Sequence, residues 1–141
     1  MTFFPGQQLS ARAILAVTLA ALCLTSCGGS ESTAPVTVTV LDVTVPLVQG
    51  VTCDQGGVGI EFTGEAGKTV TILATGASNQ TPRFYLYNPS YGTLLGASSA
   101  YGANRARLIF ALTESGVHHL TVCEANGVGG SVRVTVTVPA L

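Results

Sequence analysis

The stretch IEFTGEAGKTVTI, residues 60–72, decides the fold class of this 141-residue chain. Apolar and polar residues alternate through both of its ends, with Phe62 in the first run and Val70 in the second, and the segment from Gly64 to Gly67 separates them. A period of two is the spacing of side chains on a half-buried β-strand, and glycine permits a tight turn. The stretch therefore predicts two strands joined by a short turn.

The same alternation recurs from residue 36 to the end of the chain, and no window shows a sustained 3.6-residue apolar repeat. A slip in the alternation near Leu41 and Asp42 predicts a β-bulge. The expected strands are 36–47, 58–63, 69–74, 83–88, 93–97, 106–112, 117–124 and 132–138. Eight short strands in a chain of this length predict one all-β domain, a jelly-roll-like β-sandwich over residues 36–141.

The core of this sandwich is predicted from residues that stand in register with apolar neighbours two positions away. These are Val58, Ile60, Phe62, Val70, Ile72, Phe84, Leu86, Leu108, Phe110, Leu112, Leu120, Val122, Val134 and Val136.

The first 26 residues have the pattern of an export signal. A single basic residue, Arg12, precedes a run of twelve residues at 13–24 that are all apolar except Thr18, and this run is too short to span a membrane comfortably. The following Leu24-Thr25-Ser26-Cys27-Gly28 resembles the bacterial lipobox. The resemblance implies that the Cys27 thiol carries a diacylglyceryl group with acyl chains such as palmitate, and that a peptidase cuts just before Cys27. The alternative is an ordinary cleaved signal in which Cys27 is incidental.

The lipobox resemblance also implies an address. Gly28 after the cysteine resembles lipoproteins that are sent to the outer membrane, in a host that has one. Residues 27–35 are rich in glycine and serine without apolar periodicity, so they are predicted to form the lipidated end and a short flexible tether. We therefore expect a lipid-anchored protein of the cell envelope.

Two of the four cysteines remain after these assignments. Cys23 belongs to the signal and Cys27 to the lipid, which leaves Cys53 and Cys123. In an exported protein such a pair most simply forms a disulfide. A metal site is not expected, because the sequence has no CxxC motif.

Charge argues against some classes of partner. Charged residues make up 9% of the chain and the formal net charge is −1, so there is no basic stripe for nucleic acid. After residue 35 no apolar run approaches the roughly 20 residues of a spanning helix. The membrane is thus expected as a partner only through the lipid on Cys27.

From about residue 47 to 138 the chain resembles the bacterial pre-peptidase C-terminal domain. The resemblance rests on the stretch at 60–72, on FYLYN at 84–88 and on LTESGVHHLTV at 112–122. It implies a jelly-roll-like β-sandwich of the kind found beside secreted proteases and in cell-surface proteins. The family often has calcium-binding aspartates before the strand at 84–88, but Thr81-Pro82-Arg83 stands there, so no calcium site is implied.

The two histidines, His118 and His119, replace an aromatic pair of that family. Neighbouring residues on a strand point to opposite faces, so they cannot chelate one ion together. His118 is expected at the rim of the core with a backbone hydrogen bond, and His119 is expected on the face of Thr121 and Cys123. The alternative for His119 is a metal or acid–base role.

No catalytic pattern stands out, and we expect neither an enzyme nor a cofactor. A Gly-x-Ser-x-Gly elbow is absent from the sequence. Paired-carboxylate chemistry could draw on Glu61, Glu65, Glu114 or Glu124, but Glu65 and Glu114 fall in predicted turns. Their expected role is solubility.

The candidate binding residues are aromatic. Arg83, Tyr85 and Tyr87 alternate with Phe84 and Leu86, and further aromatic rings follow in loops, at Tyr91 and Tyr101. Flat rings beside a guanidinium suit stacking on sugars or contact with a protein. The alternative is that the tyrosines merely cover an outward sheet face.

The leading hypothesis is a lipid-anchored envelope protein whose β-sandwich is a non-catalytic binding or structural module for a glycan or another envelope protein. A second hypothesis is an accessory or inhibitor that acts in trans on a secreted hydrolase or protease. A third is an enzyme that uses His119.

Overall fold

The computed structural model describes residues 35–140. The predicted signal sequence, Cys27 and all but the last residue of the predicted tether lie outside these residues. Within the described part of the chain, no helix has the length and hydropathy needed to cross a membrane. The strands are β1 (Thr37–Leu47), β2 (Val58–Gly64), β3 (Thr69–Thr75), β4 (Pro82–Tyr87), β5 (Leu94–Ala97), β6 (Ser99–Ala100), β7 (Arg105–Ala111), β8 (Gly116–Glu124) and β9 (Gly130–Pro139).

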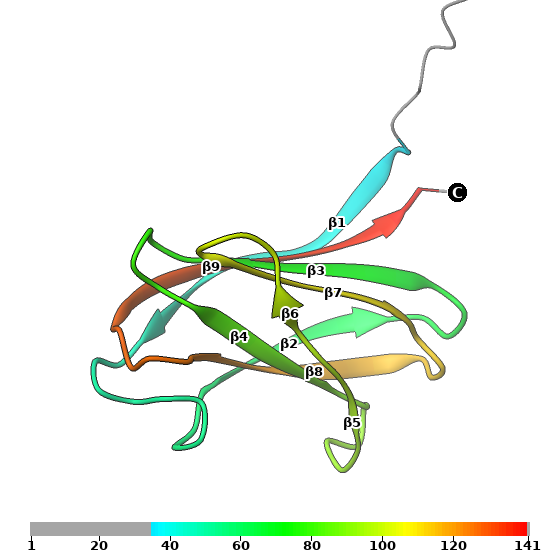
Figure 1. Ribbon diagram of the computed structural model, residues 1–141. Helices are drawn as coiled ribbons and strands as arrows, with labels where there is room; N and C mark the ends of the chain where they lie inside the picture. The colour runs from blue at the N-terminus through cyan, green and yellow to red at the C-terminus, as the bar shows by residue number, and fades with distance from the viewer. Residues whose placement is uncertain (1–34, 141) are drawn as a thin grey trace, which may run out of the picture. The chain divides into compact units, whose positions relative to one another are not determined.

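These strands form two sheets that face each other (Figure 1). One sheet has the order β1-β9-β3-β7-β6 and the other has the order β2-β8-β4-β5, and every pairing is antiparallel. The all-β sandwich predicted from the alternation is confirmed. Because antiparallel sheets can bury one face and expose the other, each strand supplies both core and surface residues.

The stretch at 60–72 does not form a hairpin, although a short turn joins its two strands. Strand β2 pairs with β8, whereas β3 pairs with β7 and β9, so the turn leads from one sheet to the other. Gly67 has a φ of +81°, which favours glycine. Its amide donates to the carbonyl of Leu112 at 2.7 Å, and the amide of Ala66 donates to the Ser115 hydroxyl at 2.9 Å. The turn therefore ties β2, β3 and the β7–β8 connection together.

Two details of the strand prediction are corrected by the structure. Strand β6 was not expected, because two residues are too few to show an alternation; Ser99 and Ala100 pair with Arg107 and Ala106. The irregularity in β1 lies between Thr39 and Leu41, slightly before the predicted position. Its cause is the extra residue that β1 carries opposite β9.

The core lies between the sheets. Ten of the predicted core residues are buried, and four others, Val58, Ile60, Leu108 and Phe110, are partly buried and pack against them. The prediction missed residues with small or isolated side chains in the same layer, namely Val45, Ala74, Ala106 and Val132. Alanine carries a weak apolar signal, but between two sheets it fills the places where the backbones approach closely.

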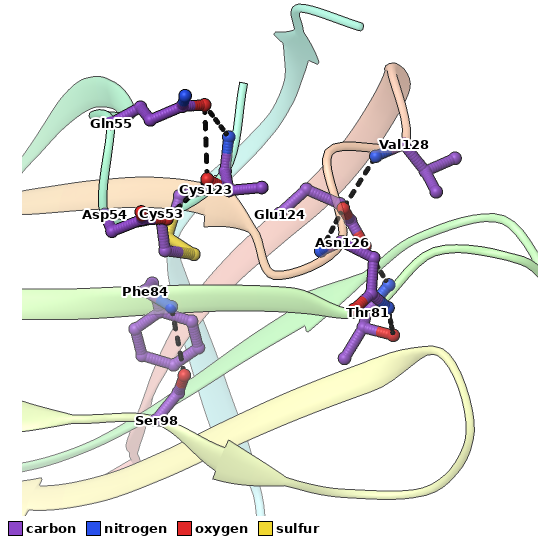
Figure 2. Close-up of a disulfide and its surroundings, with 11 residues drawn as sticks. Cys53, Asp54, Gln55, Thr81, Phe84, Ser98, Cys123, Glu124, Asn126 and Val128 are labelled. Carbon is purple, nitrogen blue, oxygen red and sulfur yellow. Dashed lines mark hydrogen bonds between the residues drawn. A yellow bond between two sulfur atoms is a disulfide. The ribbon is translucent and has the colours of Figure 1, made fainter. Parts of the chain in front are cut away.

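A buried carboxylate joins two connections at one end of the sandwich (Figure 2). Glu124 is only 1% exposed, and its carboxylate accepts hydrogen bonds from the amides of Thr81, Asn126 and Val128, each at 2.7 Å. The carboxylate of Glu124, which was considered from the sequence for paired-carboxylate chemistry, is thus bound to backbone amides inside the domain. The burial of this charge is balanced by three charge-assisted hydrogen bonds that satisfy otherwise unpaired loop amides.

An ion pair fastens the outer edge of the five-stranded sheet. Arg133 on β9 donates to both carboxylate oxygens of Asp42 on β1, at 2.8 and 2.6 Å. This hydrogen bonding, more than the simple attraction of charges, lowers the pKa of the Asp42 carboxyl. The pair is exposed to solvent, so it specifies the strand pairing more than it adds stability.

A disulfide joins Cys53, in the β1–β2 connection, to Cys123 on β8, as predicted from the sequence (Figure 2). The two cysteines are 70 residues apart in sequence, and Cys123 is buried. Beside the bond, the Thr52 hydroxyl and a backbone amide lower the pKa of the Asp54 carboxyl. The disulfide thus fixes a long connection that has no strand of its own onto the outer face of β8.

Replacing both Cys53 and Cys123 with alanine should lower the free energy of unfolding by about 4 kcal/mol, because the unfolded chain regains the freedom of a 70-residue loop. Urea denaturation of the double variant and the parent measures the difference. The parent treated with a thiol reductant while unfolded serves as the matched control and should shift equally. An unchanged unfolding midpoint would contradict the prediction.

Candidate functional site

The candidate site lies on the outer face of the four-stranded sheet. In the antiparallel register, Glu61 of β2 stands opposite His119 of β8, His119 stands opposite Tyr87 of β4, and Tyr87 stands opposite Leu94 of β5. One row of side chains therefore crosses all four strands. Directly opposite residues in such a row have their Cβ atoms roughly 5 Å apart, so neighbouring side chains are in contact distance.

The alternation of β4 divides its residues between core and surface. Phe84 and Leu86 are fully buried, whereas Arg83 is exposed and Tyr85 and Tyr87 are half-buried on the outer face. The structure therefore places these three predicted residues on one surface. Their role in binding stays a prediction.

Tyr91 extends this surface from the turn between β4 and β5. Its ring contacts the ring of Tyr87, with centroids 5.0 Å apart, and meets the imidazole of His119 edge-on at 4.7 Å. Asn88 shapes the turn, because its side-chain oxygen accepts hydrogen bonds from the amides of Gly92 and Thr93 at 3.1 and 3.0 Å. Three aromatic rings from three segments thus form one cluster.

His119 is held between two acceptors. Its Nδ1 lies 3.1 Å from the carboxylate of Glu61, and its Nε2 lies 3.3 Å from the carbonyl oxygen of Pro89. A neutral imidazole donates from one nitrogen only, so the protonated form alone donates to both partners. His119 therefore links β2, β8 and the β4–β5 turn.

Beside this link is an open groove of about 600 Å³, lined by Gly59, Ile60, Glu61, Tyr91 and His119. Gly59 contributes no side chain to it, which leaves the ring of Tyr91 and the Glu61–His119 pair as its walls. An aromatic ring face next to polar side chains can hold a ligand that has both an apolar face and hydroxyl groups.

The geometry of His119 suits positioning better than acid–base chemistry. A general base needs a nitrogen aimed at the group that loses its proton, but here both ring nitrogens face protein acceptors. The nearby hydroxyl of Thr121 contacts the Tyr91 hydroxyl at 3.2 Å. The imidazole therefore serves as a clamp for the turn that carries Tyr91.

His118 points to the opposite face, as predicted. The expected position at the rim of the core is wrong, since the side chain is fully buried and stacks on Phe62 with centroids 5.4 Å apart. Its Nδ1 lies 3.1 Å from the carbonyl oxygen of Gly116, and among residues 35–140 its Nε2 has no hydrogen-bond partner. His118 therefore acts as a flat core side chain.

Tyr101 lies apart from the aromatic cluster. It belongs to the turn between β6 and β7 and contacts Arg105 and Arg107 of the other sheet. The five predicted binding residues therefore do not form one surface. In residues 35–140 no three His, Cys, Asp or Glu side chains lie close enough together to hold a metal ion.

Sequence reasoning missed that Glu61 belongs to the site. Its partner His119 is 58 positions away, and only the register of β2 against β8 brings them together. Period-two alternation gave the face of each residue but not the pairing of the strands.

No model of a protein family matches the sequence, and a comparison with curated proteins gives no match. Among solved structures, the chain is similar to the pre-peptidase C-terminal domain of collagenase from Bacillus anthracis. The two are 16% identical with a TM-score of 0.55, over 68% of this chain and 87% of that chain. The chain has the fold of that domain.

A looser likeness is found to PliG of Aeromonas hydrophila, a periplasmic lysozyme inhibitor of g-type lysozyme. That structure is 20% identical over 75% of this chain and 87% of its own, with a TM-score of 0.43.

Replacing His119 with alanine should loosen the β4–β5 turn, because the variant loses the contacts to both Glu61 and the Pro89 carbonyl. We expect faster hydrogen exchange at the amides of Tyr91 to Thr93 and a loss of about 1 kcal/mol in global stability. Exchange measured by NMR tests this. Glu61→Gln, which keeps a hydrogen-bond acceptor for Nδ1, should have the smaller effect, and unchanged exchange in His119→Ala would contradict the clamp.

Proposed function

We propose that this protein is a lipid-anchored component of the bacterial cell envelope and that its β-sandwich is a non-catalytic binding module. The groove beside Tyr91, on the outer face of the four-stranded sheet, is proposed as the binding surface. Its ligand class is a glycan or another envelope protein, and the geometry favours a glycan.

The anchor is supported by the lipobox-like residues at 24–28, which follow an export signal of ordinary length. Residues 28–36 then connect Cys27 to β1, which begins at Thr37. Two or more acyl chains on Cys27 would hold the protein durably at a membrane, since each buried CH₂ contributes about 0.8 kcal/mol.

The disulfide supports a location outside the cytoplasm. Disulfides persist in oxidising compartments such as the periplasm or the cell surface, and Cys53 and Cys123 are joined in the folded domain. Both features, the signal and the disulfide, point to the same side of the membrane. If the host has an outer membrane, Gly28 supports that membrane as the destination.

The observation that carries the binding proposal is the cluster of Tyr87, Tyr91 and His119 beside an open groove. The groove has a rigid base, because its residues lie on paired strands or in a turn that His119 holds. A preformed surface loses little conformational entropy on binding. A pyranose ring fits such a surface, since its C–H face can stack on tyrosine while its hydroxyls bond to Glu61.

The absence of a catalytic role is part of the proposal. Both nitrogens of His119 are engaged with protein acceptors, and Glu124 is engaged with three backbone amides. Of the other carboxylates considered from the sequence, Glu61 is paired with His119. These groups hold the structure together, which is consistent with a module that binds without turnover.

Replacing Cys27 with serine should remove the lipid anchor, because serine has no thiol to alkylate. We expect the variant protein to leave the membrane fraction, and mass spectrometry of the parent should find a lipid-modified residue at position 27. A serine substitution at Cys23 is the matched control and should leave fractionation unchanged. The proposed anchor would be wrong if Cys27→Ser fractionated like the parent.

Alanine substitutions at Tyr87 and Tyr91 should weaken binding to glycans recognised by the parent on a glycan array. Each lost ring contact is expected to cost about 1 kcal/mol, or roughly fivefold in Kd. Ile109→Ala is the control, since Ile109 is an exposed apolar residue on the other sheet. Equal binding by the parent and both tyrosine variants, or no glycan bound by the parent, would refute glycan binding at this groove.

A further inference from the structure

A second concave site lies where the start of β4, the link from β5 to β6 and the turn from β6 to β7 meet. This pocket has a volume of about 300 Å³, and Arg83 and Arg105 line it together with the hydroxyl-bearing residues Thr81, Ser98 and Ser99. Arg83 comes from the four-stranded sheet and Arg105 comes from the five-stranded sheet. Small residues, Ala100 and Gly102 among them, form the rest of the lining and leave the arginines accessible.

A third cation stands next to this pocket. Arg107 lies over the ring of Tyr101, with its guanidinium carbon 3.9 Å from the ring centroid, and Arg105 lies 5.3 Å from the same centroid. The electron-rich faces of aromatic rings attract cations, so Tyr101 holds both guanidinium groups at this end of the sandwich. Half of the six lysine and arginine residues of the chain therefore gather here.

These cations have no internal counter-ion among residues 35–140. In that part of the chain, only one arginine, Arg133, has a carboxylate within 4 Å, and that carboxylate belongs to Asp42. Glu124 approaches this end through the Thr81 amide, but its oxygens accept hydrogen bonds from three backbone amides. Like charges brought together without a counter-ion repel, and a bound anion relieves that repulsion.

The Ser98 hydroxyl adds a donor to the pocket, whereas the Ser99 hydroxyl already donates to the carbonyl oxygen of Arg107 at 3.4 Å. Ser98 Oγ accepts a hydrogen bond from the Phe84 amide at 2.9 Å, which leaves its own proton for a ligand (Figure 2). Guanidinium groups present paired N–H donors in a planar fork that matches the oxygens of carboxylate and phosphate. The site therefore has the chemistry of an oxyanion receptor.

We propose that this pocket binds an oxyanion, carboxylate or phosphate, that belongs to an acidic polysaccharide. Tyr85 lies two residues from Arg83 on the same outer face of β4, so a sugar next to the bound anion would meet an aromatic ring. This names the ligand class of the binding module and in that respect rests on the proposed function. The oxyanion site itself depends only on the arginines and hydroxyls.

The strand register gives the position of the pocket relative to the beginning of β1. Thr75 at the end of β3 pairs with Arg105, whereas Thr71 near its start pairs with Thr137, close to the place where Thr37 of β1 pairs with Pro139. The β6–β7 turn and the start of β4, which line the pocket, are therefore at the end of the sandwich opposite the beginning of β1 (Figure 1). The choice of a polysaccharide over anionic lipid headgroups rests on Tyr85, which lies on the same face of β4 as Arg83.

Binding is to be measured with the full chain carrying Cys27→Ser, which has no lipid to insert into a vesicle and needs no detergent, using four probes. Polygalacturonate carries carboxylates, phosphomannan carries phosphates, dextran is neutral, and vesicles of phosphatidylglycerol supply anionic headgroups. We expect saturable binding to polygalacturonate or phosphomannan that weakens at high salt, and none to dextran at this pocket. The acidic polymer that binds identifies the oxyanion.

The double variant Arg83→Gln, Arg105→Gln should bind that polymer at least tenfold more weakly. Lys68→Gln with Arg133→Gln is the matched control, because it removes the same two charges outside the pocket, and it should stay within twofold of the parent. Arg83→Lys with Arg105→Lys keeps both charges but loses the forks, so it should fall between the parent and the glutamine variant. Circular dichroism confirms that each variant is folded.

Four outcomes would overturn the proposal: binding to neither acidic polymer, unchanged binding in the Arg83→Gln, Arg105→Gln variant, an equal loss in the control variant, and binding to phosphatidylglycerol vesicles alone. Tyr87→Ala separates this proposal from the aromatic groove. Loss of binding in the arginine variants with Tyr87→Ala unaffected supports the oxyanion pocket and counts against the groove. Loss of binding in Tyr87→Ala with the arginine variants unaffected supports the groove and counts against the oxyanion pocket. Cys27→Ser is present in every protein of these comparisons, so insertion of a lipid anchor does not contribute to the measured binding.

Discussion

Strand β8 is paired along both edges, with β2 on one side and β4 on the other, and its alternation decides which residues reach the core and which reach the surface. His118, Leu120 and Val122 are fully buried between the sheets. His119 and Thr121 point outward and contact the residues of the candidate site. A slip of one residue would exchange these two sets, so the register of β8 is fixed by the burial of its inner face.

The end of β8 is held in place by a disulfide and by a set of hydrogen bonds. Cys123, on the outer side, is covalently joined to Cys53, while Glu124, on the inner side, accepts three backbone hydrogen bonds. The disulfide restricts the unfolded chain, and the hydrogen bonds satisfy loop amides that would otherwise be buried without partners. Because both act on neighbouring residues, the β1–β2, β3–β4 and β8–β9 connections are all fastened at one end of the sandwich. The surfaces of the four-stranded sheet are built on this fixed strand.

The fold was predictable because its signal is local. Alternation around Phe62, Val70 and Phe84 reports a strand and its buried face without knowledge of the partner strand. The disulfide was predictable by elimination, once Cys23 and Cys27 had other assignments. By contrast, the turn at Gly64–Gly67 has the residues of a hairpin but joins two sheets. Its sequence specifies a change of direction, while the pairing is decided by which apolar faces meet in the core.

The candidate sites were harder to predict, because they depend on residues that are distant in sequence. The spacing of Arg83, Tyr85 and Tyr87 placed them on one face, but nothing in it indicated that Tyr101 lies with Arg105 and Arg107 of the other sheet. The role of Glu124 could not be predicted either, since a lone acidic residue at a strand end carries no sign of the three backbone amides that donate to it. Contacts between such distant side chains are decided by which strands and connections lie next to each other, and a local sequence pattern does not give that order.

The groove beside Tyr91 and the arginine pocket differ in the kinds of ligand that they can distinguish. The groove beside Tyr91 offers a ring face and the Glu61–His119 pair, in which opposite charges already neutralise each other when the imidazole is protonated. The pocket lined by Arg83 and Arg105 offers positive charge without an internal partner among the described residues. Only 9% of the residues in this chain are charged, and several of its arginines gather at this pocket. The protein's ability to distinguish charged from neutral ligands is therefore concentrated there. Under the proposed function, a neutral sugar would gain contacts only from the tyrosine groove, whereas an acidic sugar would also be attracted to the arginine pocket. Tyr85 lies beside Arg83 and one alternation from Tyr87, so one extended polymer could contact both surfaces along β4.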